Sequence, residues 1–411
     1  MRTIPGFRRS SPPRAFAALL LVPFLALSLA GCGGGIPLGV LDPVAVAEGT
    51  KQVPLFVATT RAKPKIELER MFSGDRDKTV NHAKLTVSIP PNHQTGQIEW
   101  PSRAPGDSRV NFVTADRDYM NSQAFLQTIK AELARRKPDD RTVLVFIHGY
   151  NTKFEEAVYR FAQIVNDSGF KGVPVLFTWP SRGALLDYPY DRESAVFSRD
   201  DLEATLDDIA TKTGVRKIDV LAHSMGNFLF VETLRQATIR GNGTFHGKIG
   251  QIMLAAPDID IDVFRRQLMV IGQLKLPITV FVSRDDKALN FSRMVWGSQV
   301  RAGAYTVSDP AVMEKLREAN ITVIDLSEVK GTDAMNHGKF ASSPDVVKMI
   351  GGRLAEDGGI QQRPAGLGEG IMALGATVGH TVGQTVGTAV AAPGAILSGQ
   401  APVLAGQADS E

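Results

Sequence analysis

Cysteine is almost absent from this chain of 411 residues: Cys32 is the only one, so no disulfide can form within the chain. Charge of one sign is also lacking, because 46 Lys and Arg offset 43 Asp and Glu without forming a basic stripe. The seven histidines include no H-x-x-x-H pair, and no glycine-rich phosphate loop follows a strand-like run. The sequence therefore predicts a protein without metal, cofactor or nucleic-acid partner.

The apolar run over residues 15–29 is shorter than a membrane span. Arginines precede it and small residues end it, a pattern typical of a secretory signal peptide. The ending Leu-Ala-Gly-Cys resembles a bacterial lipobox with Cys32 as the lipidated residue. We therefore predict a signal peptide over 1–31 and a lipid-attached tether over 32–52. The protein would be exported and held in the membrane of the cell envelope, facing the periplasm or the surface. An uncleaved anchor helix is the alternative.

From residue 141 onward, apolar β-branched runs alternate with helical periodicity, which predicts a mostly parallel sheet covered on both faces. The expected strands are 142–147, 173–179, 217–222, 249–255, 277–283 and 320–326. The expected helices are 122–136, 153–167, 198–213, 225–240, 260–271, 288–297, 311–318 and 343–354. Short alternating runs at 53–58, 84–89, 97–99 and 109–113 predict antiparallel strands before them. The fold class is thus α/β, with the domain spanning 53–354.

The last segment, 355–411, differs in composition from the rest. Residues 371–408 carry no Asp, Glu, Lys or Arg and consist largely of Gly, Ala, Thr and Val. Such a composition favours a low-complexity, disordered tail. Glycine recurs every fourth residue from 375 to 387, so a helix there would instead present one glycine-lined face for self-association.

One motif combines a strand end with a helix start. The run before Ala222-His223-Ser224-Met225-Gly226 is strand-like, and a helical pattern follows at once. This is the layout of the nucleophile elbow G-x-S-x-G, with alanine in the first glycine position. The close approach of strand and helix requires small residues two positions before and after the serine. Taken alone, Ser224 could also be an ordinary helix cap.

Two further segments turn this motif into a predicted catalytic set. The buried strand 142–147 ends in His148-Gly149, where such folds place an oxyanion loop, so the backbone N–H groups of Tyr150 and Met225 are the candidate oxyanion donors. Aspartates follow two later strands, and His337 follows the last. The candidate acids are Asp258, Asp285 and Asp286. The order Ser, Asp, His is that of α/β-hydrolases.

At these residues the chain resembles the α/β-hydrolase superfamily. More narrowly, it is similar to a bacterial family of lipoprotein-like hydrolases of formerly unknown function, grouped with esterases and lipases. The resemblance covers roughly 53–351 and rests on the strings ATTR (58–61), FIHGYN (146–151), WPSRG (179–183), AHSMG (222–226) and DKAL (286–289). It implies Ser224 as nucleophile, Asp286 as acid and His337 as base.

The resemblance implies a serine hydrolase that cleaves a small-molecule or lipid ester through an acyl-enzyme. A catalytically silent fold that serves as an envelope binding or assembly module is the alternative. The segment 181–197 is expected to be a loop that walls the substrate cleft, and the segment between 256 and 277 has room for only one short helix. The sequence shows no fixed cationic group for an acidic substrate.

Overall fold

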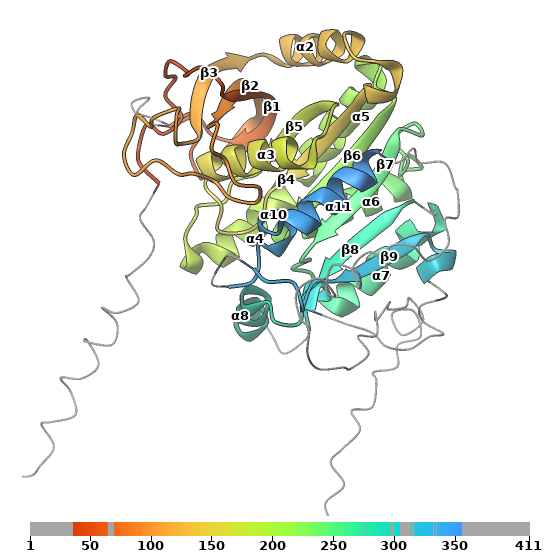
Figure 1. The fold of residues 1–411 in the computed structure, drawn as a ribbon. Coiled ribbons are helices and arrows are strands. Elements are labelled where there is room, and N and C mark those ends of the chain that lie inside the picture. The colour runs from red at the N-terminus through yellow and green to blue at the C-terminus, as the bar shows by residue number, and fades with distance from the viewer. Residues whose placement is uncertain are drawn as a thin grey trace, which may run out of the picture.

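The computed structural model describes residues 36–64, 70–274, 276–296, 300–304, 314, 316–331, 333 and 335–355. Its centre is a nine-stranded sheet of order β3-β2-β1-β5-β4-β6-β7-β8-β9 (Figure 1). The pairs β1–β2 and β2–β3 are antiparallel, and all other pairs are parallel. The predicted fold class, a mostly parallel sheet with antiparallel N-terminal strands, is confirmed.

The strands are β1 (Lys51–Arg61), β2 (Arg76–Ile89), β3 (Val113–Met120), β4 (Thr142–Ile147), β5 (Val173–Thr178), β6 (Lys217–His223), β7 (Ile249–Ala255), β8 (Ile278–Val282) and β9 (Ile321–Asp325). The central parallel strands are continuous apolar runs because both of their faces are buried. In β4, for example, Val143, Val145 and Ile147 pack into one apolar cluster, and Leu144 and Phe146 pack into the other.

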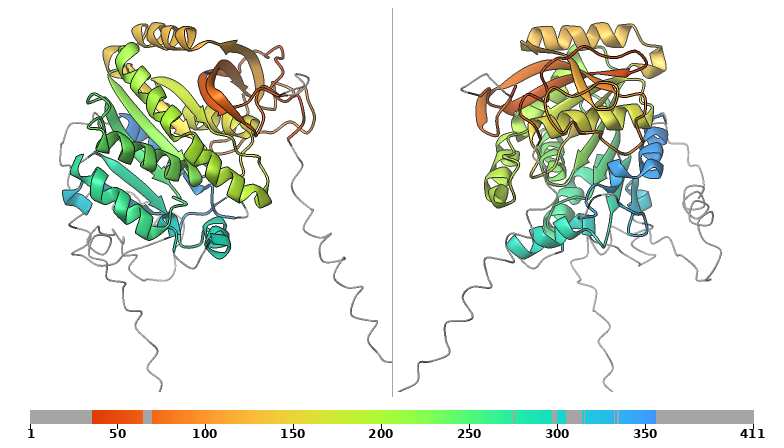
Figure 2. Two further views of the ribbon diagram at one scale, coloured as in Figure 1. Left: turned by 180° about the vertical axis from the view of Figure 1, so that it is seen from behind. Right: turned by 60° about the vertical axis from the view of Figure 1, so that its left-hand side comes forward.

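Helices cover both faces of the sheet. The longer ones are α2 (Ser122–Ala134), α3 (Phe154–Ser168), α4 (Tyr188–Phe197), α5 (Arg199–Lys212), α6 (Met225–Ile239), α7 (Ile261–Ile271), α8 (Lys287–Trp296) and α11 (Pro344–Ala355), with the short α10 (Lys339–Ser342) before the last. Figure 1 looks onto the face covered by α3 and α11, and the view from behind in Figure 2 shows α5, α6 and α7 on the other face. This sandwich brings the carboxyl ends of the parallel strands to one edge.

Three local predictions were wrong. The runs 97–99 and 109–113 are not strands, because β2 pairs instead with β3, in a register from His82 opposite Met120 to Ser88 opposite Val113. The segment 181–197 is not a loop throughout, since it contains a short 3-10 turn (Leu185–Asp187) followed by α4. Tertiary contacts, described below, hold this polar helix in place.

Residues 36–50, which fall within the predicted tether, pack against the domain. Val40 and Leu41 are buried in the same apolar cluster as α3. The Tyr159 hydroxyl donates a hydrogen bond of 2.8 Å to the Val40 carbonyl, and the Val44 N–H donates to Thr114 O at 3.0 Å. The packed domain therefore includes these residues.

The predicted signal peptide, the lipidated Cys32 and the tail beyond residue 355 lie outside the described residues. Within the part of the chain that the structure describes, we found no helix of the length and apolarity needed to cross a membrane.

Candidate active site

Ser224 occupies the bend between β6 and α6, in a strained backbone conformation. Its φ of 53° and ψ of −122° lie outside the regions that a residue with a side chain prefers. Neighbouring backbone holds it there: the Ser224 N–H donates to Ala255 O at 2.9 Å, and its carbonyl accepts from Asp258 N at 3.2 Å. The buried Asn227 amide donates to both carbonyls, at 3.1 Å to Ser224 O and 2.7 Å to Ala255 O. The sequence pattern did not single out Asn227.

The small residues on either side of Ser224 have a clear steric reason. Ala222 is fully buried in the sheet. A Cβ added at Gly226 would lie 2.4 Å from the His148 carbonyl oxygen and 2.7 Å from that of Ile147. These contacts are shorter than van der Waals distance and involve backbone, which cannot swing away as a side chain could.

We therefore expect Gly226→Ala to lower both the melting temperature and the hydrolytic activity, because the added methyl group would push α6 away from β4. Gly352→Ala is a matched control: this glycine is also helical, a Cβ there would meet nothing within 4 Å, and alanine favours a helix by roughly 1 kcal/mol. Thermal melting of both variants checks the pair. Equal melting temperatures for Gly226→Ala and the unmodified protein would contradict this account.

Asp286 and His337 form a hydrogen-bonded pair at the carboxyl end of β8. The His337 Nδ1–H donates to Asp286 Oδ2 at 2.7 Å. Asp286 is fully buried at the start of α8, and its other oxygen accepts from the Leu289 N–H at 3.0 Å. Burial opposes the charged imidazole, but the Asp286 carboxylate outweighs it and raises the pKa of His337 above its usual value. The His337 side chain keeps 17% of its surface exposed, so the ring remains accessible.

The elbow and this pair are brought together. The ring of His223, which directly precedes Ser224, lies 4.6 Å from the ring of His337, and its Nε2–H donates to the His337 carbonyl at 3.2 Å. Gly149 lies close to Ser224 on the other side of the site, since a Cβ placed on Gly149 would be only 2.8 Å from Ser224 Cβ. Among the described residues no hydrogen bond joins Ser224 Oγ to His337. In free enzymes this bond is often long and shortens when substrate binds.

The other two candidate acids hydrogen-bond different partners. Both oxygens of Asp285 contact the buried Lys339 Nζ, at 2.7 and 2.8 Å. Asp258 accepts hydrogen bonds from the hydroxyls of Tyr188, at 2.8 Å, and Ser292, at 2.7 Å. Neither hydrogen-bonds to His337 in the described structure, whereas Asp286 does.

The backbone N–H groups of Tyr150 and Met225 have no acceptor among the described residues, as expected of oxyanion donors. The loop before Tyr150 is held by His148: its Nδ1–H donates to Gly149 O at 2.8 Å, and its Nε2 accepts from Trp179 N at 3.2 Å. Burial, together with the charge of Arg61, lowers the pKa of His148 to about 3, so this ring is neutral and structural.

Arg61 ties several of these loops together, a role that the sequence did not reveal. Its fully buried guanidinium donates to the carbonyls of Thr152, at 2.8 Å, Ser181, at 2.8 Å, and Ser73, at 3.1 Å. Burial lowers its pKa to about 10, so Arg61 still carries a charge at neutral pH. The sequence signals were its place at the end of an apolar run and within the string ATTR (58–61) that the resemblance shares.

A cavity of about 390 Å³ opens beside His337 and Tyr150. Its wall is mostly apolar and comes from segments far apart in the sequence: Ile98, Trp100, Phe146, Ala157, Leu185, Met335, Phe340 and Ala341. Leu185 belongs to the segment predicted to wall the cleft, and its carbonyl accepts a hydrogen bond of 2.5 Å from the Tyr150 hydroxyl. Apolar cavities with a few convergent polar groups are typical of small-molecule sites.

A family model described as alpha/beta hydrolase of unknown function (DUF900) matches residues 122–353, more than half of the chain. The chain belongs to this family of α/β-hydrolases. A relative from Nostoc sp. (strain PCC 7120), uncharacterized protein alr1448, is 30% identical over 126 residues, which are 25% of this chain and 33% of the relative. The chain thus matches only about a third of that relative's length.

Two solved structures are similar to this hydrolase at low identity. An arylesterase shares 11% identity with a TM-score of 0.31, covering 77% of this chain and 87% of the esterase. An esterase from Rhizomucor miehei shares 13% identity with a TM-score of 0.31, covering 84% and 92%. TM-scores of this size do not establish a common fold, so the assignment stands on the family match and on the sheet topology.

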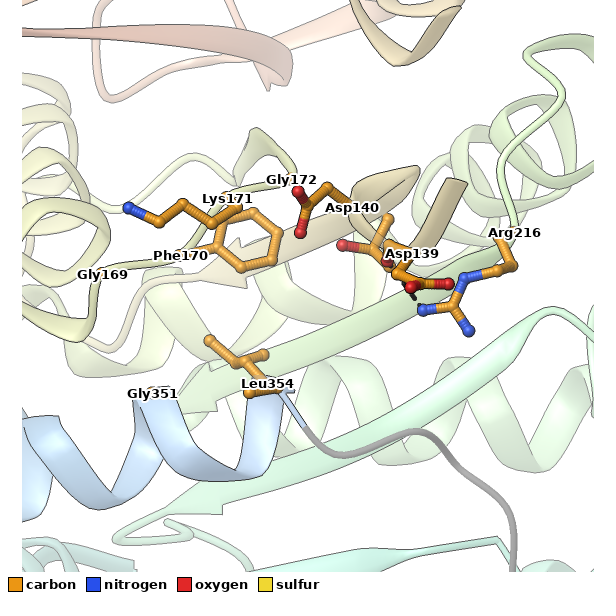
Figure 3. Close-up of a pocket in the computed structure, with 11 residues that line it drawn as sticks. Asp139, Asp140, Gly169, Phe170, Lys171, Gly172, Arg216, Gly351 and Leu354 are labelled. Atoms are coloured by element: carbon orange, nitrogen blue, oxygen red, sulfur yellow. Dashed lines mark hydrogen bonds between the residues drawn. The ribbon is translucent and has the colours of Figure 1, made fainter. Parts of the chain in front are cut away.

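The hydrolase has a second cavity, of about 240 Å³, at the opposite edge of the sheet (Figure 3). It lies by the amino ends of β4 and β6, where Arg216 donates from its guanidinium to the Asp139 carbonyl at 2.8 Å. Active sites of open α/β sheets lie at the carboxyl ends of the strands. The cavity beside His337 is therefore the candidate active site; Tyr150 and His337 line it, and the buried Ser224 is not among its lining residues.

Proposed function

We propose that this hydrolase is a serine hydrolase that cleaves a carboxylic ester through an acyl-enzyme. The observation that carries the proposal is the hydrogen bond between Asp286 and His337 beside the strained Ser224 elbow. A serine hydroxyl is a weak nucleophile until a base removes its proton, and the base needs an orienting acid. All three groups come from the carboxyl ends of parallel strands, or from the loop that follows the last strand.

In the proposed mechanism Ser224 Oγ attacks the ester carbonyl carbon while His337 Nε2 takes the hydroxyl proton. Asp286 keeps the proton of the ring on Nδ1, so that Nε2 is the free base. The Tyr150 and Met225 N–H groups stabilise the oxyanion, each by about 3 kcal/mol. His337 then gives its proton to the leaving alcohol, and a water activated by the same ring releases the acid.

Two measurements on the purified protein test the proposal: hydrolysis of short 4-nitrophenyl esters, and covalent labelling by a fluorophosphonate probe. We expect both. A correctly folded protein that does neither would contradict the proposal and favour the catalytically silent binding module instead.

The raised pKa of His337 leads to a pH prediction. The ring works as a base only when it is neutral, so raising its pKa above 6.5 moves the acid limb of the activity profile to higher pH. We expect kcat/KM for a neutral ester to rise with pH, with a midpoint above 6.5. A profile measured from pH 5 to 9 with its midpoint at or below 6.5 would contradict this prediction.

We also propose that the hydrolase is an exported lipoprotein held in the membrane through Cys32. The support is the lipobox-like ending Leu-Ala-Gly-Cys after a short apolar run. We expect palmitate labelling of the full chain in a bacterial host and its loss in Cys32→Ala. Equal labelling of both proteins would contradict the anchor without affecting the proposed catalysis.

A further inference from the structure

Among the described residues that line the cavity beside His337, Arg160 is the one Lys or Arg. Arg160 lies on α3, one helical turn after Glu156, and its guanidinium side chain forms part of the cavity wall. Its hydrogen bond among the described residues goes to the neutral Gln163 amide oxygen, at 2.8 Å. Burial lowers its pKa to about 10, which leaves Arg160 charged at neutral pH.

The carboxylates of the same wall already have donors. Glu156 Oε2 accepts the Lys153 N–H at 2.6 Å, in the first turn of α3. Asp333 accepts the N–H groups of Met335, His337 and Gly338, at 3.0 to 3.1 Å, and so shapes the loop that carries the base. Burial raises the pKa of Glu156 above its usual value.

Arg160 therefore differs from its charged neighbours. No carboxylate of the described structure hydrogen-bonds to Arg160 or forms an ion pair with it, although Asp333, Asp167 and Glu156 lie near enough for their charges to raise its pKa. The guanidinium has five N–H donors in a fixed fork that matches a carboxylate. A ligand carboxylate in the cavity would accept hydrogen bonds from the Arg160 N–H groups that have no acceptor among the described residues.

We infer that Arg160 selects esters that carry a carboxylate on the chain occupying this cavity. The inference rests on the proposed ester hydrolysis, and it names the substrate class. Arg160 binds the distant carboxylate, the apolar wall contacts the methylene chain, and the ester group lies against Tyr150 and His337.

The kinetic test compares 4-nitrophenyl hydrogen adipate with the neutral 4-nitrophenyl hexanoate. We expect the unmodified hydrolase to prefer the adipate ester. Arg160→Gln should lower the ratio of kcat/KM, adipate over hexanoate, by about 10- to 100-fold, the usual effect of losing a charge-assisted hydrogen bond. Arg160→Lys keeps the charge and should retain part of the preference. An unchanged ratio in Arg160→Gln would overturn the inference.

Arg192 provides a matched control. It lies on α4 with its guanidinium 3.7 Å from the centre of the Phe228 ring, and it does not line the cavity. Arg192→Gln should leave the adipate preference as it is. A similar fall of the ratio in this variant would show a general effect of charge, which would also overturn the role of Arg160.

A binding experiment does not depend on turnover. Monomethyl adipate is titrated calorimetrically into Ser224→Ala protein, with and without Arg160→Gln. We expect the Kd for monomethyl adipate to be at least tenfold higher in the Ser224→Ala, Arg160→Gln double variant than in Ser224→Ala. Equal Kd values for the two proteins would refute the carboxylate site. Failure of the proposed function would appear separately, as the absence of hydrolysis of either ester by the unmodified protein.

Discussion

Replacing Ser224 by alanine should lower kcat/KM for 4-nitrophenyl butyrate by roughly 10⁴- to 10⁶-fold and abolish fluorophosphonate labelling. The variant keeps the Cβ and the backbone bonds to Ala255 and Asp258, so the bend itself is retained. Only the atom that would form the acyl-enzyme is lost. Residual hydrolysis would come from substrate binding and the oxyanion donors.

Ser88→Ala is the matched control for this experiment. Ser88 is as deeply buried as Ser224, and its hydroxyl has no hydrogen-bond partner in the described structure. We expect this variant to keep full labelling and turnover. Undiminished labelling of Ser224→Ala, with an unchanged melting temperature, would show that another residue is the nucleophile.

The strands could be predicted well from the sequence because the sheet is buried on both faces. β4 and β7 begin and end where the apolar runs predicted. A run of Val, Leu, Ile and Phe between polar segments has few other ways to bury its side chains. Ser224, Asp286 and His337 follow the predicted strands β6, β8 and β9 in the sequence. The pattern therefore predicted that all three lie at the carboxyl ends of the parallel strands.

Contacts between distant segments could not be predicted in this way. The segment containing α4 has no strong helical pattern, and the helix is held by its buried Asp191, which accepts from Ser181 Oγ at 2.6 Å and Arg182 N at 3.0 Å. Arg160 lies in a correctly predicted helix, yet its place in the cavity depends on loops more than fifty residues away. The sequence showed no fixed cationic group for an acidic substrate, because the pattern of α3 alone does not reveal that Arg160 lines this cavity.

Asp285 and Asp286 are adjacent but should respond differently to amidation. In Asp286→Asn, the His337 ring loses the carboxylate that accepts its Nδ1–H, and the amide can instead donate to that nitrogen. The wrong tautomer then places a proton on Nε2. We expect kcat to fall about 10⁴-fold.

Asp286→Asn should also move the acid limb of any residual activity to lower pH. The carboxylate raises the pKa of His337, so its removal lets that pKa fall, and the ring becomes neutral at lower pH. The sign of this shift distinguishes an orienting acid from a residue that only supports the fold. If Asp286→Asn lowered the rate but left the acid limb of the pH profile at the same pH, this would count against the acid role of Asp286.

Asp285→Asn acts on the loop around the base. Asp285 contacts Lys339 through both oxygens and accepts from Asn336 Nδ2 at 2.9 Å. These partners lie on either side of His337. Removing the charge leaves the buried Lys339 ammonium with only neutral oxygens, so we expect a lower melting temperature and a moderate fall in kcat.

The pH profile of Asp285→Asn should keep its acid limb near that of the unmodified protein, because the Asp286 carboxylate still faces His337. If the two variants exchanged these effects, the acid would be Asp285. If both stayed active and Asp258→Asn were inactive with an unchanged melting temperature, the acid would come from the end of β7. Asp258 already accepts from Tyr188 and Ser292 and lies 3.4 Å from Arg301 Nε, so its amidation should instead lower the melting temperature.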